Sequence, residues 1–280
     1  MNIQLDSERN MTLDLDKATS MLLVGTCGTG KTYTIKDILR QVKASGEPMS
    51  VVYLDEHESD YFEVNLICGE LLNKTGTLKP NELKSLAVAL KEQRIFRTSM
   101  LREVGVTELK QLRGRMINLY CVGGKMYQPD DIVCRFEDGL QKFYLVKDLY
   151  ERMTRKGDNI FVNSTYIGEY KPTRMIICLD EFYTSDMPKS VQTGIHNMVK
   201  DIIRFGRLLH QNIILSTQRL SQHKEYRDLV DIVDVKMLFH PIHEASDYEV
   251  LFGKKPEGTS RRGIATIKTQ DEFRTVGTLL

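Results

Sequence analysis

The chain has 280 residues, of which 41% are hydrophobic and 28% are charged, so it can form one large domain or a core with an inserted subdomain. The formal net charge of +1 provides no global attraction for nucleic acid, and any DNA contact must come from local basic patches. No stretch approaches roughly 18 consecutive apolar residues, and the amino-terminal segment lacks the apolar core of a signal peptide, so neither a membrane span nor secretion is predicted. The five cysteines form no Cys-x-x-Cys pair, which is typical of reduced thiols in a cytoplasmic protein.

The most specific motif lies near the amino terminus. Segment 25–32 reads GTCGTGKT and matches the pattern G-x-x-x-x-G-K-[ST] without a mismatch. Residues 12–24 before it predict two short strands, and residues 31–44 predict a helix because apolar residues recur at helical spacing. A strand, a glycine-rich loop and a helix in this order form a phosphate-binding loop, in which backbone N–H groups and the positive end of the helix face the phosphates.

This loop predicts that the chain binds ATP together with Mg²⁺. Lys31 would reach the β and γ phosphates, and the Thr32 hydroxyl would ligate the metal ion. The residues expected to contact the nucleotide are Gly25, Thr26, Cys27, Gly28, Thr29, Gly30, Lys31, Thr32 and Tyr33.

Short apolar runs recur along the rest of the chain, separated by helical stretches. They predict buried strands at 51–55, 175–179, 212–216, 233–239 and 263–268. Runs of this kind are typical of a mostly parallel sheet that is covered on both faces. The predicted fold class is therefore α/β, with a RecA-like, mostly parallel central sheet flanked by helices, of the additional-strand type of P-loop NTPase.

The interval between residues 62 and 172 interrupts this pattern. Residues 81–115 are helical in character and locally basic, whereas residues 117–168 read as short strands joined by turns. We therefore expect an inserted α+β lobe at 63–171 and an ATPase core formed by residues 1–62 and 172–280.

A second catalytic pattern follows the run 175–179, which ends in Asp180 and Glu181. This is the Walker B pattern. Asp180 can hold the water shell of Mg²⁺ opposite Thr32, so these two residues are the predicted metal-binding pair. Glu181 can act as a general base on the attacking water or orient it.

Polar residues near the next predicted strand add to this site. Gln218 follows the strand at 212–216, and its amide would lie between the two Walker motifs, within reach of the γ-phosphate and the attacking water. Arg204 and Arg207 precede that strand. Arginine stabilises charge on a transferring phosphoryl group and is often supplied by a neighbouring subunit. A helix arginine at the surface is more often simply solvated, so the chemistry alone leaves the role of Arg207 open.

Taken together, these motifs resemble the FtsK/HerA superfamily of ring-forming, DNA-translocating ATPases. The matching strings are LLVGTCGTGKT at 22–32, VVYLD at 51–55, IICLDE at 176–181 and FGRLLHQNIILSTQR at 205–219. The last is the most diagnostic, because it is similar to the family's arginine helix followed by a strand ending in ATQR. By this resemblance Gln218 matches the sensor glutamine, and Arg207 matches a position that serves as a trans-acting arginine finger in related conjugative motors, with Arg204 as the fallback. Residues 62–172 match no part of the family.

The resemblance implies a task as well as a site. It implies an ATP hydrolase that works at the subunit interfaces of a homo-oligomeric ring, a pentamer or a hexamer, and moves double-stranded DNA. A motor of this size without a recognisable DNA-reading module favours viral genome packaging in the cytoplasm of a host cell, with a capsid portal as docking partner. A conjugative or mobile-element transfer motor that docks on a transfer-channel protein is the alternative. A non-translocating ATP-dependent switch or assembly factor is an alternative of another class, against which Glu181 and Gln218 argue.

Two basic groups could line the pore of such a ring. One lies between Arg94 and Arg115, and the other consists of Lys254, Lys255, Arg261 and Arg262. An ordinary solvated charged face explains each group equally well, and the glycine-containing segment 253–263 is the better candidate for a DNA-contacting loop.

Overall fold

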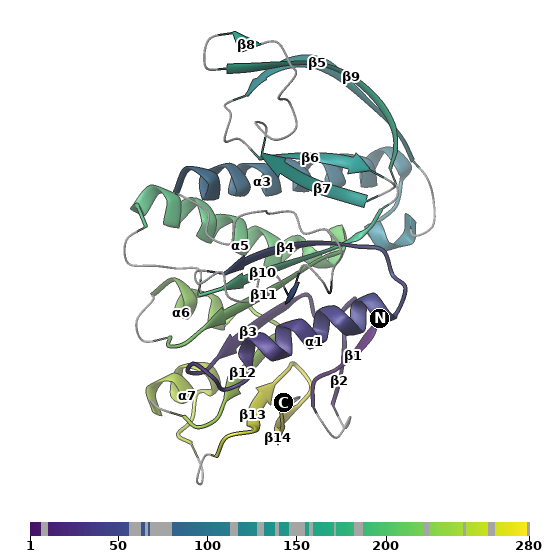
Figure 1. Ribbon diagram of the computed structural model, residues 1–280. Helices are drawn as coiled ribbons and strands as arrows, with labels where there is room; N and C mark the ends of the chain where they lie inside the picture. The colour runs from purple at the N-terminus through teal and green to yellow at the C-terminus, as the bar shows by residue number, and fades with distance from the viewer. Residues whose placement is uncertain are drawn as a thin grey trace.

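The computed structural model describes residues 1–6, 11–55, 63–64, 67, 80–112, 117–127, 132–137, 140–145, 155–156, 159–170, 172–181, 187–220, 224–242, 245–256 and 261–278. Their central feature is a seven-stranded sheet with the strand order β14-β13-β12-β3-β11-β10-β4 (Figure 1). In chain order the strands are β3 (Ser20–Val24), β4 (Met49–Asp55), β10 (Arg174–Asp180), β11 (Gln211–Thr217), β12 (Val235–Phe239), β13 (Ile264–Lys268) and β14 (Phe273–Gly277).

Five neighbouring strands, from β12 to β4, are parallel. β13 runs antiparallel to β12, and the edge strand β14 runs antiparallel to β13. The predicted mostly parallel α/β sheet is thus confirmed, and every strand expected in the core is present within two residues of its predicted bounds. β11 lies between the strand that enters the phosphate-binding loop and the Walker B strand, since Ser216 pairs with Leu23 on one side and with Asp180 on the other. This order is that of the additional-strand type.

Helices cover both faces of the sheet. α1 (Lys31–Ala44) lies on one face, and α5 (Lys189–Leu209), α6 (Lys224–Val230) and α7 (Ala245–Phe252) lie on the other, with α3 (Pro80–Val104) outside α5 (Figure 1). Successive residues of a strand point to opposite faces, so each strand serves both layers. In β11, Ile213 and Leu215 join the apolar cluster of α3, α5, α6 and α7, whereas Ile214 joins the cluster of α1.

A short antiparallel hairpin, β1 (Asn2–Gln4) with β2 (Thr12–Asp14), packs at the edge of the α1 layer. The prediction of two short strands over residues 12–24 is confirmed by β2 and β3.

The interval 63–171 contains both predicted halves. Its helical half consists of α3 and the 3-10 helix η1 (Leu109–Leu112). Its strands form two antiparallel sheets, one of β5 (Ile117–Tyr127), β8 (Arg155–Lys156) and β9 (Asn159–Tyr170) and one of β6 (Ile132–Glu137) and β7 (Leu140–Leu145). Leu83, Leu86 and Leu90 of α3 lie in the same apolar cluster as α5, so this helix continues the core. The division into core and lobe stays a prediction.

Candidate active site

The phosphate-binding loop starts where β3 ends and closes at the first turn of α1. Gly28 and Gly30 have φ angles of 73° and 106°, which glycine adopts without strain, and Gly30 is the N-cap of α1. Gly25 is required for a different reason, because a Cβ atom there would lie 2.8 Å from the Cβ of Phe239 and 2.8 Å from the Thr29 hydroxyl. The loop therefore has the backbone freedom and the close approach that a phosphate cradle needs.

Lys31 points into this loop. Its Nζ donates hydrogen bonds to the carbonyls of Gly25 at 2.5 Å and Thr26 at 3.2 Å, and lies 3.8 Å from Oε1 of Glu181. The Lys31 side chain is 7% exposed, so its positive charge is concentrated where phosphate oxygens would enter. The loop is further closed by the Thr29 hydroxyl, which donates to the Thr26 carbonyl at 2.7 Å.

The Walker B residues meet the loop as predicted. The Thr32 hydroxyl donates to Oδ2 of Asp180 at 3.2 Å across the gap between α1 and β10. The next residue, Glu181, has φ of 47°, a left-handed conformation that is strained for a residue with a side chain, and its backbone N–H donates to the Ser216 carbonyl at 3.0 Å. This turn at the end of β10 directs Glu181 toward Lys31.

These residues fit a magnesium ion. A buried carboxylate and a hydroxyl side by side are hard oxygen ligands, and Mg²⁺ in nucleotide sites is held by few protein oxygens together with phosphates and water. Among the described residues there is no group of three or more His, Cys, Asp or Glu that could hold a metal ion.

Gln218 lies one residue beyond the end of β11, at the same edge of the sheet. It lines a small hollow together with Gly25, Thr26 and Phe239, as its predicted place beside the Walker motifs requires. Two residues that sequence reasoning missed shape the backbone just after it. Oδ1 of buried Asp247 accepts a hydrogen bond from the Leu220 N–H at 3.2 Å, and Nε of Arg227 donates to the Leu220 carbonyl at 3.3 Å.

Arg207 lies away from this site in its own chain. It is near the end of α5, which leads into the amino-terminal end of β11, whereas the phosphate-binding loop follows the carboxyl end of the parallel strand β3. A seven-residue strand such as β11 spans about 20 Å, so Arg207 and the phosphate-binding loop lie at opposite ends of the parallel strands. The Arg207 side chain is 60% exposed, and its Nε lies 3.3 Å from Oε1 of Glu108. Arg204 is exposed on the same helix.

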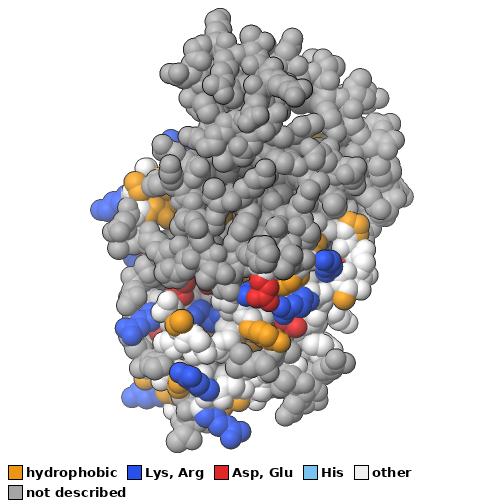
Figure 2. All heavy atoms as spheres, viewed as in Figure 1, with side chains coloured by type: hydrophobic (Ala, Val, Ile, Leu, Met, Phe, Trp, Pro, Cys, Tyr) orange, Lys and Arg blue, Asp and Glu red, His pale blue; other side chains and the backbone are white. Residues whose placement is uncertain are grey.

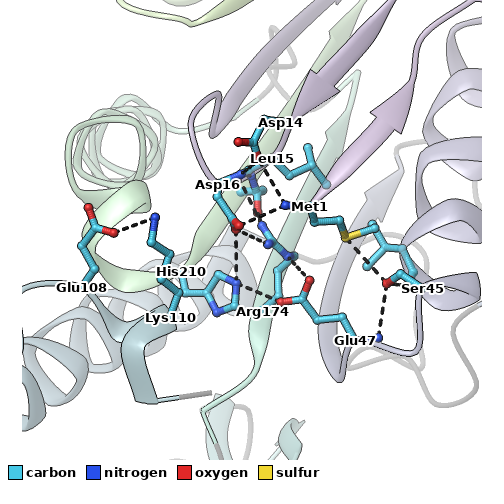
Figure 3. Close-up of polar contacts among 12 residues, drawn as sticks. Met1, Asp14, Leu15, Asp16, Ser45, Glu47, Glu108, Lys110, Arg174 and His210 are labelled. Atoms are coloured by element: carbon cyan, nitrogen blue, oxygen red, sulfur yellow. Dashed lines mark hydrogen bonds and ion pairs between the residues drawn. The ribbon is translucent and has the colours of Figure 1, made fainter. Parts of the chain in front are cut away.

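At that opposite edge a buried charged cluster holds the ends of the strands together (Figure 3). The side chain of Arg174 is fully buried, donates to Oε2 of Glu47 at 3.2 Å and to Oδ1 of Asn212 at 2.7 Å, and pairs with Asp16. Nε2 of His210 lies 3.1 Å from Oε1 of Glu47. No local sequence signal marks this cluster, because its five members come from four separate segments of the chain.

The basic residues between Arg94 and Arg115, which were predicted as pore residues, differ in their exposure to solvent. Arg97 is fully buried, where it donates to the carbonyls of Leu209 at 2.5 Å and Thr173 at 3.2 Å, so including it among DNA-contacting residues was wrong. Arg94 is partly exposed and pairs with Asp201 at 3.3 Å. Arg113 and Arg115 lie outside the described residues. On the face drawn in Figure 2, the described lysines and arginines are interspersed with acidic and apolar side chains.

The second basic group, in the segment 253–263, is exposed. All four of its basic residues are at the surface, namely Lys254, Lys255, Arg261 and Arg262, and Nζ of Lys254 lies 4.2 Å from the ring centroid of Phe273.

No helix among the described residues is both long enough and apolar enough to span a bilayer.

Comparisons with known proteins bear on the fold. No protein-family model matches the sequence, and no curated protein matches it. Solved structures do. The pCW3 conjugation coupling protein TcpA, in its monomer form with ATPγS, is 14% identical with a TM-score of 0.58, and the match covers 99% of this chain and 65% of that chain. EssC ATPases 2 and 3 from Geobacillus thermodenitrificans are 14% identical with a TM-score of 0.63, covering 100% of this chain and 44% of that chain.

A third structure, the cytoplasmic domain of the type VII secretion ATPase EccC from Thermomonospora curvata, is 16% identical with a TM-score of 0.56, covering 99% of this chain and 28% of that chain. The chain thus spans less than two thirds of each of these three relatives. Its fold is similar to that of these three ATPases, and the mostly parallel central sheet with flanking helices is the P-loop NTPase fold that the motifs predicted.

Proposed function

We propose that this protein is an ATP-hydrolysing translocation motor that acts as a ring and moves double-stranded DNA. The observation that carries the proposal is the meeting of Lys31, Thr32, Asp180 and Glu181 at one edge of the sheet, with the strand that leads to Gln218 between the two Walker motifs.

Each residue of this set has a role in hydrolysis. Lys31 would hold the β and γ phosphates, and Thr32 and Asp180 would hold Mg²⁺, which when bound neutralises phosphate charge. Glu181, which faces Lys31, would accept a proton from the attacking water or orient it. Gln218 would orient the same water from the adjacent strand end. A switch that only binds nucleotide does not need both Glu181 and Gln218, which supports hydrolysis over the switch.

The position of Arg207 supports a ring. Arg207 is at the opposite edge of the sheet from its own phosphate-binding loop, so it would act only on a neighbouring subunit. The Arg207 side chain is 60% exposed although Glu108 is only 17% exposed, and ion pairs of solvent-exposed groups contribute little, so the guanidinium can be released to a neighbour. Exposed Phe205 and Leu208 beside it would supply apolar contact area in a subunit interface.

For the task itself we propose viral genome packaging, with conjugative DNA transfer as the second candidate. The string FGR at 205–207 before β11 supports the first, and the fold match to the conjugation coupling protein supports the second. The fold match to a type VII secretion ATPase makes a polypeptide the competing cargo. We also propose the docking partner, which would be a capsid portal for genome packaging and a transfer-channel protein for conjugative transfer.

The test is steady-state ATP hydrolysis with and without long double-stranded DNA, with heparin as a matched polyanion. We expect stimulation by DNA and not by heparin, a loss of about 100-fold or more in Glu181→Gln, and a loss of about 1000-fold in Arg207→Ala. The control is Arg274→Ala, which removes an exposed arginine of the edge strand β14 and should keep most of the activity. Hydrolysis that ignores DNA would remove the DNA motor from consideration and favour a polypeptide cargo or a switch.

A mixing experiment tests the ring. Arg207→Ala subunits keep an intact phosphate-binding loop, and Lys31→Ala subunits keep Arg207. If the finger acts in trans, the mixture regains activity that neither variant has alone. A mixture as inactive as its components would contradict the shared site.

A further inference from the structure

Ser216 is a buried serine whose hydroxyl has no partner. Its side chain is 0% exposed, and within the described part of the chain its Oγ makes no hydrogen bond. A buried hydroxyl that has given up water without gaining a partner lowers the stability of the folded state. Native proteins rarely keep such a group unless it has another use.

The position of Ser216 suggests that use. It is the residue of β11 that pairs directly with Asp180 of β10. Along β11, Ile214 belongs to the apolar cluster of α1, so Ser216, two residues later, faces the same side. Along β10, Ile176 and Cys178 belong to that cluster, and Asp180 continues their row.

Ser216 and Asp180 are therefore side by side on the face that α1 covers. Neighbouring parallel strands lie about 4.8 Å apart, so the two side chains flank one small volume. Thr32 enters that volume from α1, since its hydroxyl donates to Asp180 at 3.2 Å. The backbone holds Ser216 firmly there, because its carbonyl accepts from Glu181 at 3.0 Å and from the Tyr226 hydroxyl at 3.1 Å.

We propose that the Ser216 hydroxyl is a further ligand-contacting group of this site, which hydrogen-bonds the water shell of the divalent cation that binds with the nucleotide. The proposal rests on the proposed function in so far as that function places a metal–nucleotide complex at Thr32 and Asp180. The hydroxyl has no hydrogen-bond partner among the described residues, and in the complex it would gain one. The unpaired hydroxyl therefore lowers the stability of the free protein, and the hydrogen bond that it forms in the complex increases the affinity for the metal.

Ser216→Ala separates the effect on the stability of the free protein from the effect on metal affinity, because it removes only the hydroxyl and leaves a methyl group in place. The matched control is Ser50→Ala. Ser50 is also buried in a core strand, but its Oγ lies 3.2 Å from Oγ1 of Thr173 and is satisfied. Thermal unfolding is measured without ligand, with ADP and EDTA, and with ADP over a series of Mg²⁺ concentrations.

We expect Ser216→Ala to unfold at the same temperature as the wild type, or higher, without ligand. The Mg²⁺ concentration for half-maximal stabilisation should rise about three- to tenfold, the usual effect of one lost hydrogen bond. The shift produced by ADP with EDTA should not change. Ser50→Ala should do the opposite, with a lower unfolding temperature and an unchanged Mg²⁺ requirement.

A Ser216→Ala protein that is less stable without ligand and has the wild-type Mg²⁺ requirement would overturn the proposal and leave the ATPase intact. A wild-type protein that neither ADP nor Mg²⁺ stabilises would instead contradict the proposed function, and the role of Ser216 would fall with it.

Discussion

Thr32 and Asp180 are 148 positions apart in the sequence, yet the hydroxyl of one donates to the carboxylate of the other at 3.2 Å. This contact joins the phosphate-binding loop to the Walker B strand, and it is the point at which a divalent cation would be held.

Replacing the Asp180 carboxylate tests this contact directly. Asp180→Asn should weaken Mg²⁺-dependent nucleotide binding tenfold or more, since hydrogen bonds to charged groups are among the stronger ones. Titration with a fluorescent nucleotide with and without Mg²⁺ measures this, with the exposed Asp271→Asn as control; equal loss without Mg²⁺ would contradict a metal role.

Asp247 should affect catalysis without touching the nucleotide. It accepts from the backbone N–H of Leu220, two residues beyond Gln218, and so holds the segment that presents the glutamine. Asp247→Ala should lower kcat about tenfold and leave KM for ATP nearly unchanged, because in the proposed mechanism Gln218 orients the attacking water and does not hold the nucleotide. Steady-state kinetics over a range of ATP concentrations checks this. A variant whose KM rises while kcat is preserved would show that Asp247 acts on binding.

Gly206 should tolerate no side chain. A Cβ atom there would lie 2.6 Å from the Gln211 carbonyl oxygen and 3.2 Å from the Thr19 hydroxyl, because the end of α5 packs directly on the start of β11. Gly206→Ala should destabilise the fold by about 1–3 kcal/mol, the usual effect of overpacking. Gly194 in the same helix has nothing within 4 Å of such an atom, so Gly194→Ala should stabilise by about 0.5–1 kcal/mol. Urea unfolding of both variants measures these opposite signs, and similar changes in the two would refute the packing argument.

Arg97 should matter for folding and not for DNA. Its guanidinium joins α3 to the end of α5 and to the residue before β10 through the carbonyls of Leu209 and Thr173. Arg97→Met keeps the side-chain length and removes the donors, so two buried carbonyls lose a partner and stability should fall by about 1–3 kcal/mol or more. The exposed Arg204→Met is the control and should change stability by less than about 0.5 kcal/mol. A weaker response to DNA at unchanged stability would return Arg97 to the candidate pore residues.

The buried cluster around Arg174 should make stability depend on pH. Burial alone would raise the pKa of Asp16, but hydrogen bonds from Arg174 and from the amino terminus hold it well below the ordinary value of 3.8. A carboxyl with a lowered pKa stabilises the fold above its ordinary pKa, and this contribution is lost as the pH falls below about 4. Asp16→Asn lacks the contribution, so the stability gap between wild type and variant should be largest near pH 7 and should narrow toward pH 3. Urea midpoints across that range measure it, and a constant gap would contradict the assignment.

The sequence by itself determined the elements and the chemical identity of the site. The phosphate-binding loop is a contiguous string whose function depends on local backbone freedom, and the Walker B carboxylates end a run that is apolar enough to be a buried strand. Apolar periodicity is likewise local, so the core strands and α1 were predicted within two residues. The resemblance to FtsK/HerA ATPases rests on the same short strings. The structures that share the fold are only 14% to 16% identical to this chain, so the fold agrees where most of the sequence does not.

Only the tertiary structure decided which side chains are buried, paired or left without a partner. Arg97 and Arg94 look alike in the sequence, but Arg97 is fully buried and donates to the carbonyls of Leu209 and Thr173, whereas Arg94 is partly exposed and pairs with Asp201. Nothing in the local sequence distinguishes Ser216 from other strand residues, and only the strand order places it beside Asp180. Strand order, helix packing and desolvation are set by contacts between distant segments, and no local pattern records them.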